Sequence, residues 1–220
     1  MRKRNFTLVE LLVVIGIIGI LAALAIPMVI GAKARGRVTQ ARTDMTSIST
    51  AFEAMAKDYG MMANMDSSTS YKLGGVSFSE NPSGSGCITI GEYSGNKYDP
   101  NKIDEYCKVI AELSDPSNSH LSVSLNKRKV KYLDAQSGYD PSKSPTDSAN
   151  MKHTWLDPWG NPYMIRINVD GSEHIVDPSS SGSKRQKRII LWSLGPDGKA
   201  GDDKYDKDNV PSWKDGDWFD

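Results

Sequence analysis

The residues best suited to chemistry in this chain are aspartates near its C-terminal end. Five of them lie between positions 197 and 208, separated by glycines and lysines: Asp197, Asp202, Asp203, Asp206 and Asp208. Calcium takes about six to eight oxygen ligands from carboxylates and carbonyls, and glycine lets a loop turn tightly enough to bring such ligands together. The pattern predicts a Ca²⁺ site. A solvated acidic tail without a metal is the alternative.

A second position of chemical interest is Glu10, which opens the most apolar stretch of the chain. Residues 11–30 contain no charged side chain, and about 20 residues at 1.5 Å each give a helix of about 30 Å, the thickness of a bilayer's hydrocarbon core. The basic residues at positions 2–4 are typical of the cytoplasmic flank of such a segment. A carboxylate at this place is unfavourable without a partner, which marks Glu10 as a functional position.

One long helix is expected to carry Glu10 and then to pack on a folded domain. Beyond the apolar stretch, apolar residues recur at alternating spacings of three and four, which is typical of one helix face: Val38, Ala41, Met45, Ile48, Phe52, Met55 and Tyr59. The helix is predicted over residues 6–59, with Gly60 at its end. Pro27 is expected to bend or locally melt it. A cleaved signal peptide ending at Ala23-Leu24-Ala25 is a competing interpretation, but it explains neither Glu10 nor the continuing helix.

The rest of the chain predicts a loop-rich middle and a small sheet. A short helix is expected over residues 103–113, a strand over 130–133, and loops over 114–118 and 138–150. Strands are expected over residues 163–169, 174–176 and 188–194, with Asp170-Gly171 as a hairpin turn. Cys87 and Cys107 are expected to form a disulfide if the domain lies in an oxidising compartment, although two free thiols are the other possibility.

Composition argues against several classes of function. The formal net charge is zero, so no overall field draws the chain to nucleic acid, and the basic clusters at residues 127–131 and 184–188 are interpreted as solvated faces. The three histidines lie far apart at positions 120, 153 and 174, without the spacing of a metal site or catalytic triad. No motif of a hydrolase, metalloprotease or phosphate-binding loop occurs. The chain is therefore not expected to be an enzyme.

Three strings of residues carry a resemblance to a known family. The first ten residues, MRKRNFTLVE, resemble the class III signal of type IV pilins and of the pseudopilins of type II secretion. Residues 157–163, DPWGNPY, are similar to the string that opens the sheet in major pseudopilins. Residues 193–198, SLGPDG, followed by clustered aspartates and Trp213, are similar to the calcium loop of those proteins.

The resemblance implies a processed membrane protein. A prepilin peptidase would remove the leader, residues 1–5, between Asn5 and Phe6 and methylate the new amino group, giving N-methylphenylalanine. Asn5 departs from the family, which nearly always has glycine before the cut. Glu10 would pair with the methylated amino terminus of Phe6 in a neighbouring subunit, and the helix around Pro27 would loosen as subunits pack. The carbonyl of Leu194 and the carboxylates of Asp197, Asp202, Asp203 and Asp206 would bind Ca²⁺.

The resulting expectation is an α+β protein in which a long N-terminal helix packs on a small C-terminal antiparallel sheet with a calcium loop. Its regions would be a membrane and assembly helix over residues 6–30, an amphipathic half over 31–60, a variable region over 61–152, and the sheet and loop over 153–220. The resemblance implies the major pseudopilin of a type II secretion system, held by one span in the inner membrane with its C-terminal domain periplasmic or extracellular.

Such a subunit would polymerise with itself and work with prepilin peptidase, minor pseudopilins and an inner-membrane assembly platform. A type IV pilus subunit or a minor pseudopilin is the alternative within this class. A membrane-anchored or secreted calcium-dependent binding protein that acts alone is the alternative from another class.

Overall fold

The structure is a computed structural model of the whole chain, and it forms two compact units, Met1–Thr39 and Gln40–Asp220. It describes residues 8–60, 63–67, 70–80, 85–91, 93–94, 97–98, 102–121, 125–172, 174–176, 178, 184–199 and 209–212. For residues 24–28, 30, 64–67, 93–94 and 97–98 it describes the backbone alone. The expected leader, together with Phe6, lies outside the described residues.

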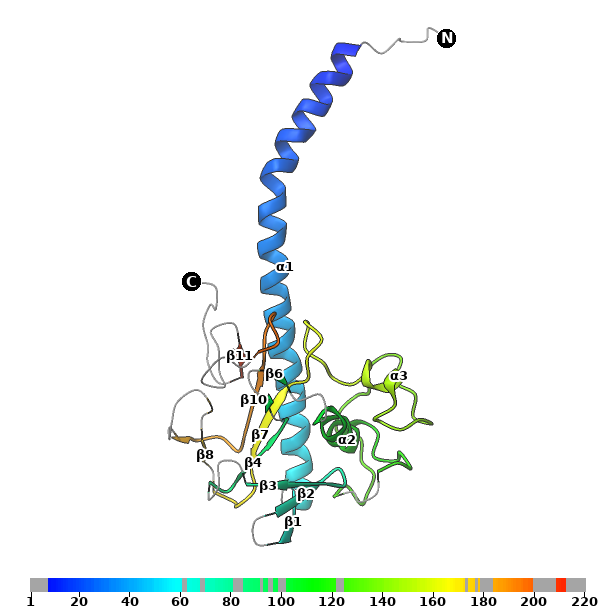
Figure 1. Cartoon of the computed structure of the whole chain (residues 1–220), viewed down its shortest axis with the longest axis vertical. Coiled ribbons are helices and arrows are strands. Elements are labelled where there is room, and N and C mark those ends of the chain that lie inside the picture. The colour runs from blue at the N-terminus through cyan, green and yellow to red at the C-terminus, as the bar shows by residue number, and fades with distance from the viewer. Residues whose placement is uncertain are drawn as a thin grey trace. The chain divides into compact units, whose positions relative to one another are not determined.

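The long helix predicted from the apolar pattern is present as α1, Leu8–Tyr59 (Figure 1). It ends as expected, because Gly60 adopts a φ of 74° and its amide donates to the Ala56 carbonyl oxygen at 2.8 Å. The expected melting at Pro27 is not seen, since the helix continues through this residue. A proline removes only one intrahelical donor, and Ala23, Leu24 and Ala25 before it are strong helix formers.

Within the second unit, α1 buries one stripe of apolar side chains. Ala41, Met45, Ile48, Phe52 and Met55 are each at most 1% exposed. These are the central members of the stripe predicted from the sequence, whereas Val38 and Tyr59 at its ends are partly exposed. The amphipathic half of the helix therefore packs on the domain as expected.

This stripe belongs to the same unit as a four-stranded antiparallel sheet. Its strand order is β11 (Val210–Pro211), β10 (Ile189–Ser193), β7 (Met164–Asn168) and β4 (Cys87–Ile90). The register pairs Ile88 with Ile167 and Ile167 with Ile189, and paired residues point to the same face. This isoleucine face is directed toward α1, because Ile189 lines a cavity together with Met45 and other residues of the helix. The opposite face carries a separate buried cluster that includes Cys87 and Trp192.

The expected hairpin at Asp170-Gly171 is wrong in its pairing. The return strand exists as β8, Ile175–Val176, but it pairs with β9, Lys184–Arg185, whereas β7 pairs with β4 and β10. The Asn168 side chain turns the chain aside, because its amide donates to the Asp170 carboxylate at 2.7 Å and to the His174 carbonyl oxygen at 3.0 Å. Because β4 and β10 occupy both edges of β7, no edge is left for β8 to pair with.

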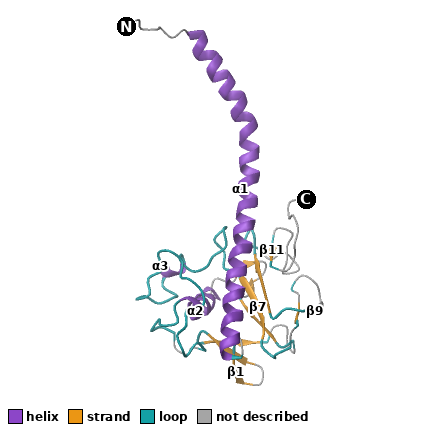
Figure 2. Cartoon of the chain, turned by 180° about the vertical axis from the view of Figure 1, so that it is seen from behind, coloured by secondary structure: helices purple, strands orange, loops and turns teal. Residues whose placement is uncertain are grey.

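The loop-rich region has more regular structure than the sequence indicates. It contains a second sheet of β1 (Asn64–Ser67), β2 (Ser70–Leu73) and β3 (Val76–Ser79), and a pair formed by β5 (Tyr93–Ser94) and β6 (Lys97–Tyr98). The predicted helix is confirmed as α2, Ile103–Ser114, and a short α3, Ser148–Met151, lies in the expected loop. Figure 2 shows helix and strand within this one unit.

The strand predicted over residues 130–133 does not form. The amides of Tyr132 and Leu133 both donate to the Leu113 carbonyl oxygen, at 2.9 and 3.1 Å. Because both bonds go to one carbonyl at the end of α2, the segment caps that helix and joins no ladder. The chain as a whole is α+β, as expected.

Candidate functional site

Glu10 lies in the first turn of α1 and is solvent-exposed. Its neighbours are apolar and exposed as well: the large apolar side chains that the structure describes between Leu8 and Val29 are 45% to 78% exposed. Consecutive residues such as Val13, Val14 and Ile15 are all exposed, so the apolar surface surrounds the helix and does not form one stripe. A helix that is apolar all round requires an apolar environment or a partner.

The sequence predicts a membrane-crossing segment over residues 6–30. Among the residues that the structure describes, no helix is both long enough and apolar enough to cross a membrane.

The second candidate site is the turn formed by residues 157–161. Asp157 is 4% exposed, and its Oδ1 accepts hydrogen bonds from the backbone amides of Trp159 at 3.0 Å and Asn161 at 2.7 Å. Its other oxygen, Oδ2, accepts from the Ser193 hydroxyl at 2.5 Å. Burial raises the pKa of the Asp157 carboxyl above its usual range, and the hydrogen bonds from Ser193, Asn161 and Trp159 act against that shift without cancelling it.

This turn holds the start of the predicted calcium loop. The Asn161 side-chain amide donates to the Gly195 carbonyl oxygen at 3.2 Å, and the Gly195 amide donates to the Ser193 hydroxyl oxygen at 3.0 Å. Gly198 has a φ of 64°, and a Cβ there would meet the Asn161 side-chain oxygen at 3.0 Å. Asn161 and Gly195 are 34 positions apart in the sequence, so two distant segments form one hydrogen-bonded structure.

The predicted calcium ligands are only partly within this structure. Leu194 is buried, and Asp197 is exposed, with its carboxylate accepting from the Lys199 amide at 2.8 Å. Asp202, Asp203 and Asp206 lie outside the described residues. Among the described residues, no three histidine, cysteine, aspartate or glutamate side chains are grouped to hold a metal ion.

The same turn is also tied to α1. The Tyr163 hydroxyl donates to Asp44 Oδ2 at 3.0 Å. Burial raises the pKa of Asp44, against a smaller opposing effect of this hydrogen bond. Burial likewise raises the pKa of Tyr163, and the nearby Asp44 carboxylate adds to the effect. The string at residues 157–163 therefore connects the helix, the sheet and the loop.

The expected disulfide is not formed, since Cys87 and Cys107 are both free and buried. Cys87 lies on the sheet face opposite α1, in a cluster with Trp192 and Met164. Cys107 lies on α2, where its sulfur accepts a hydrogen bond from the Thr154 hydroxyl at 3.5 Å. The two thiols thus belong to different parts of the core, and each behaves as a small apolar side chain.

Sequence reasoning missed the role of Asp157 and Asn161. The sequence gives residues 157–163 only a resemblance to the string that opens the sheet in major pseudopilins, whereas in the structure their polar side chains bind the loop that follows β10. The available signal was the pair of an aspartate and an asparagine four positions apart around Gly160, which has a φ of 94°. Asp and Asn side chains commonly bond to nearby backbone amides in such turns.

Comparisons with known proteins find similarity at the N-terminus and along most of the chain. Residues 1–26 match the family described as the prokaryotic N-terminal methylation motif. The chain is 24% identical over 212 residues to the type II secretion system core protein G of Pseudomonas aeruginosa, covering 96% of each protein, and also 24% identical to that of Aeromonas hydrophila. It is 50% identical over 50 residues to the type IV major pilin protein PilA of Myxococcus xanthus, a match that spans 23% of that pilin. No solved structure matches. These matches support a type IV pilin-like or pseudopilin family for the chain.

Proposed function

We propose that the protein is the major pseudopilin of a type II protein secretion system, a structural subunit that polymerises into a periplasmic filament. The observation that carries the proposal is the extent of the similarity. The match to core protein G covers 96% of this chain, whereas the match to the major pilin covers 23%. Similarity to a pseudopilin thus includes the domain, whereas similarity to the pilin covers less than a quarter of the chain.

The N-terminal part would act first as an anchor and then as an assembly element. Prepilin peptidase would cut between Asn5 and Phe6, and residues 6–30 would hold the subunit in the inner membrane with the domain in the periplasm. Glu10 would then bind the methylated amino group of Phe6 in a neighbouring copy. A carboxylate in an apolar environment is strongly unfavourable without a partner, so this pair would form only in the assembly and would set the register between subunits.

Assembly would depend on further partners and on a change in the helix. Minor pseudopilins would begin the filament, and an inner-membrane assembly platform would extract each subunit from the membrane. Because Pro27 lacks an amide hydrogen, the helix around it is the place where α1 would loosen during packing.

The C-terminal loop would bind Ca²⁺. The donors suit this ion, because Asp197 presents a carboxylate at the surface and the adjoining sequence supplies Asp202, Asp203 and Asp206, with the Leu194 carbonyl as a further oxygen. Bound calcium would neutralise the clustered carboxylates. The chain's own contribution is the buried turn, where Asp157 and Asn161 hold Ser193 and Gly195 and so fix the base of the loop.

The role is proposed to be structural and not enzymatic, since the relatives are structural subunits of secretion systems and pili. A type IV pilus subunit is the second candidate, favoured by the 50% identity to a major pilin over 50 residues.

Deletion of the gene in its native host separates the two candidates. A major pseudopilin is required for release of secreted proteins into the medium, whereas loss of a pilus subunit removes surface pili and leaves secretion intact. Complementation with the wild-type chain should restore secretion, and complementation with Glu10→Leu should not. Intact secretion together with lost pili would refute the proposal in favour of the pilus subunit. A wild-type chain that stays monomeric in mild detergent and forms no filament in cells would favour a binding protein that acts alone.

A further inference from the structure

The basic loop, residues 127–131, has no role in the function proposed above. Its sequence, KRKVK, places four cations in five positions. The side chains of Lys127, Arg128, Lys129 and Lys131 are all exposed. Lys131 forms a surface ion pair with Asp134 at 3.0 Å, but Lys127 and Lys129 form no ion pair within the described part of the chain.

The loop is held by a buried asparagine beneath it. The Asn126 side-chain amide donates to the Val130 carbonyl oxygen at 2.6 Å, and its Oδ1 accepts from the Val130 amide at 3.0 Å. The Asn126 backbone amide donates to Glu112 Oε1 at 2.7 Å, which ties the loop to α2. Lys129 adopts a φ of 54°, a left-handed conformation that is uncommon for a lysine. Such strain persists when the surroundings fix the backbone, and it is frequent at functional positions.

The loop is also attached to the end of α1. The Tyr59 hydroxyl donates to Asn126 Oδ1 at 3.0 Å and accepts from the Arg128 amide at 3.0 Å, while the Arg128 guanidinium lies 5.9 Å from the centre of the Tyr59 ring. The Tyr132 hydroxyl donates to the Asp58 carboxylate at 2.5 Å. The cations are therefore presented by a scaffold that is already ordered, which lowers the entropic cost of binding a partner.

The loop carries an apolar residue as well as charge. Val130 is 37% exposed, and it is the one exposed large apolar residue among those of the second unit whose side chains the structure describes. A partner that matches the loop would combine acidic groups with apolar ones. Residues 213–220, WKDGDWFD, have this composition, with aspartates at 215, 217 and 220 and aromatic residues at 213, 218 and 219. Aromatic rings also attract lysine and arginine cations.

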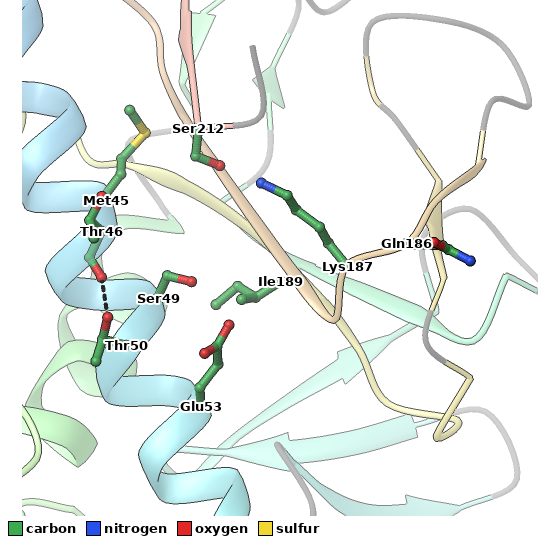
Figure 3. Close-up of a pocket in the computed structure, with 9 residues that line it drawn as sticks. All are labelled: Met45, Thr46, Ser49, Thr50, Glu53, Gln186, Lys187, Ile189 and Ser212. Atoms are coloured by element: carbon green, nitrogen blue, oxygen red, sulfur yellow. Dashed lines mark hydrogen bonds between the residues drawn. The ribbon is translucent and has the colours of Figure 1, made fainter. Parts of the chain in front are cut away.

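The described structure ends at Ser212, on the side of α1 opposite the loop. Ser212 lines a cavity of about 430 Å³ with Ser49 and Glu53 of α1 and with Lys187, and Figure 3 shows these side chains around one space. On the other side, Asp58 contacts Tyr132, which directly follows the loop. Ser49 precedes Asp58 by nine positions, so the two residues lie about 180° apart around a helix that turns about 100° per residue. Figures 1 and 2 agree, because β11 and α2 lie on opposite sides of the lower part of α1.

We propose that the basic loop binds residues 213–220 of a second copy of this chain. A loop of one subunit that binds a different segment of the next subunit forms a heterologous contact, which builds an open filament when the rotation between subunits does not close a ring. The inference rests on the proposed function, because it names the contact that would join neighbouring domains in the homopolymer. Charge complementarity of this kind mainly sets partner choice and register.

Charge reversal in the full chain tests the contact. With the native assembly machinery present, Lys127→Glu with Lys129→Glu is expected to lower the yield of sheared filaments about tenfold, which corresponds to about 1.4 kcal/mol. The control is Lys57→Glu with Lys152→Glu, which makes the same change in charge at two exposed lysines outside the loop and should stay within about twofold of wild type. Adding Asp215→Lys and Asp217→Lys to the loop variant should restore the yield.

Unchanged filaments in the loop variant would overturn the proposal, as would a loss that the second pair of reversals does not restore. A wild-type chain that forms no filament would instead remove the proposed function and this contact with it. The two failures are therefore distinguishable.

Cysteine cross-linking identifies which copy supplies the segment. Two forms of the chain are co-expressed, one carrying Lys129→Cys and the other Asp217→Cys, and the filaments are oxidised before denaturing electrophoresis. A disulfide-linked dimer of the two forms is expected, and neither form expressed alone should give it. If the dimer is absent, and a chain carrying both substitutions gives only an internally linked monomer, the loop binds its own segment and the proposal is wrong.

Discussion

Replacing Asp157 tests whether the buried turn holds the C-terminal loop. The structure gives this carboxylate three donors, namely the amides of Trp159 and Asn161 and the hydroxyl of Ser193. Asp157→Ala leaves all three without their acceptor. Ser193 is 0% exposed and cannot easily recover a hydrogen bond from water, whereas the two amides belong to partly exposed residues.

The size of the effect follows from these contacts. A buried donor left without an acceptor costs about 1–3 kcal/mol, and two rehydrated amides add about 1 kcal/mol together, for a total of about 3 kcal/mol. Burial raises the pKa of Asp157, so the wild-type carboxylate is itself desolvated, and this offsets part of the loss. We expect the free energy of unfolding to fall by about 2 kcal/mol in Asp157→Ala, and by about 1 kcal/mol in Asp157→Asn, which keeps one acceptor oxygen.

The assay is urea unfolding of the full chain in mild detergent, followed by tryptophan fluorescence and analysed by the midpoint at constant slope. Asp147→Ala is the matched control. Asp147 is a partly exposed cap whose carboxylate accepts from the Ala149 amide of the short helix α3 at 2.8 Å, and its loss should cost at most about 1 kcal/mol. The reasoning is refuted if Asp157→Ala is no more destabilising than this control.

Four further outcomes are expected. Burial raises the pKa of the Asp44 carboxyl above its ordinary value of 3.8. The stability that Asp44 contributes is therefore fully present below pH 3.8 and is lost as the pH rises through the pKa of the folded state. Asp44→Asn should remove this part of the pH dependence of the free energy of unfolding, as measured by urea unfolding. Glu10→Leu should abolish filaments while leaving the subunit in the membrane, and normal filament yield would exclude the pairing role. Removing Ca²⁺ with EDTA should lower both the thermal midpoint and the filament yield, whereas unchanged values would leave the loop a solvated tail. Alkylation of the denatured, unreduced protein should modify both Cys87 and Cys107, and a mass showing neither modified would contradict the free thiols.

The sequence predicted those parts of the fold that depend on local pattern. The spacing of Met45, Ile48 and Phe52 indicates the buried face of α1 without reference to any other element, and the same holds for α2. The pairing of strands depends on distant residues. β4 comes from the loop-rich middle and fills one edge of β7, and no local feature of residues 87–90 shows which strand they will join.

The candidate sites likewise include residues that the sequence singles out and contacts that only the tertiary structure shows. Residue type was enough to select Glu10 and the aspartate loop, because a charge in an apolar run and clustered carboxylates are unusual wherever they occur. The link between the turn at Asp157 and the loop at Ser193 depends on tertiary structure, since the two residues are 36 positions apart. The same is true of the two cysteines, because the spacing of two thiols says nothing about the faces on which they lie.

The central claim is that this chain is a processed filament subunit, and the intact mass of the protein recovered from its native membranes tests it most directly. The account predicts a chain that begins at Phe6 and carries one additional methyl group. A chain that begins at Ile26 would show a cleaved signal peptide and no anchor, and a chain that keeps Met1–Asn5 would show no prepilin processing. Either of these results would contradict the account.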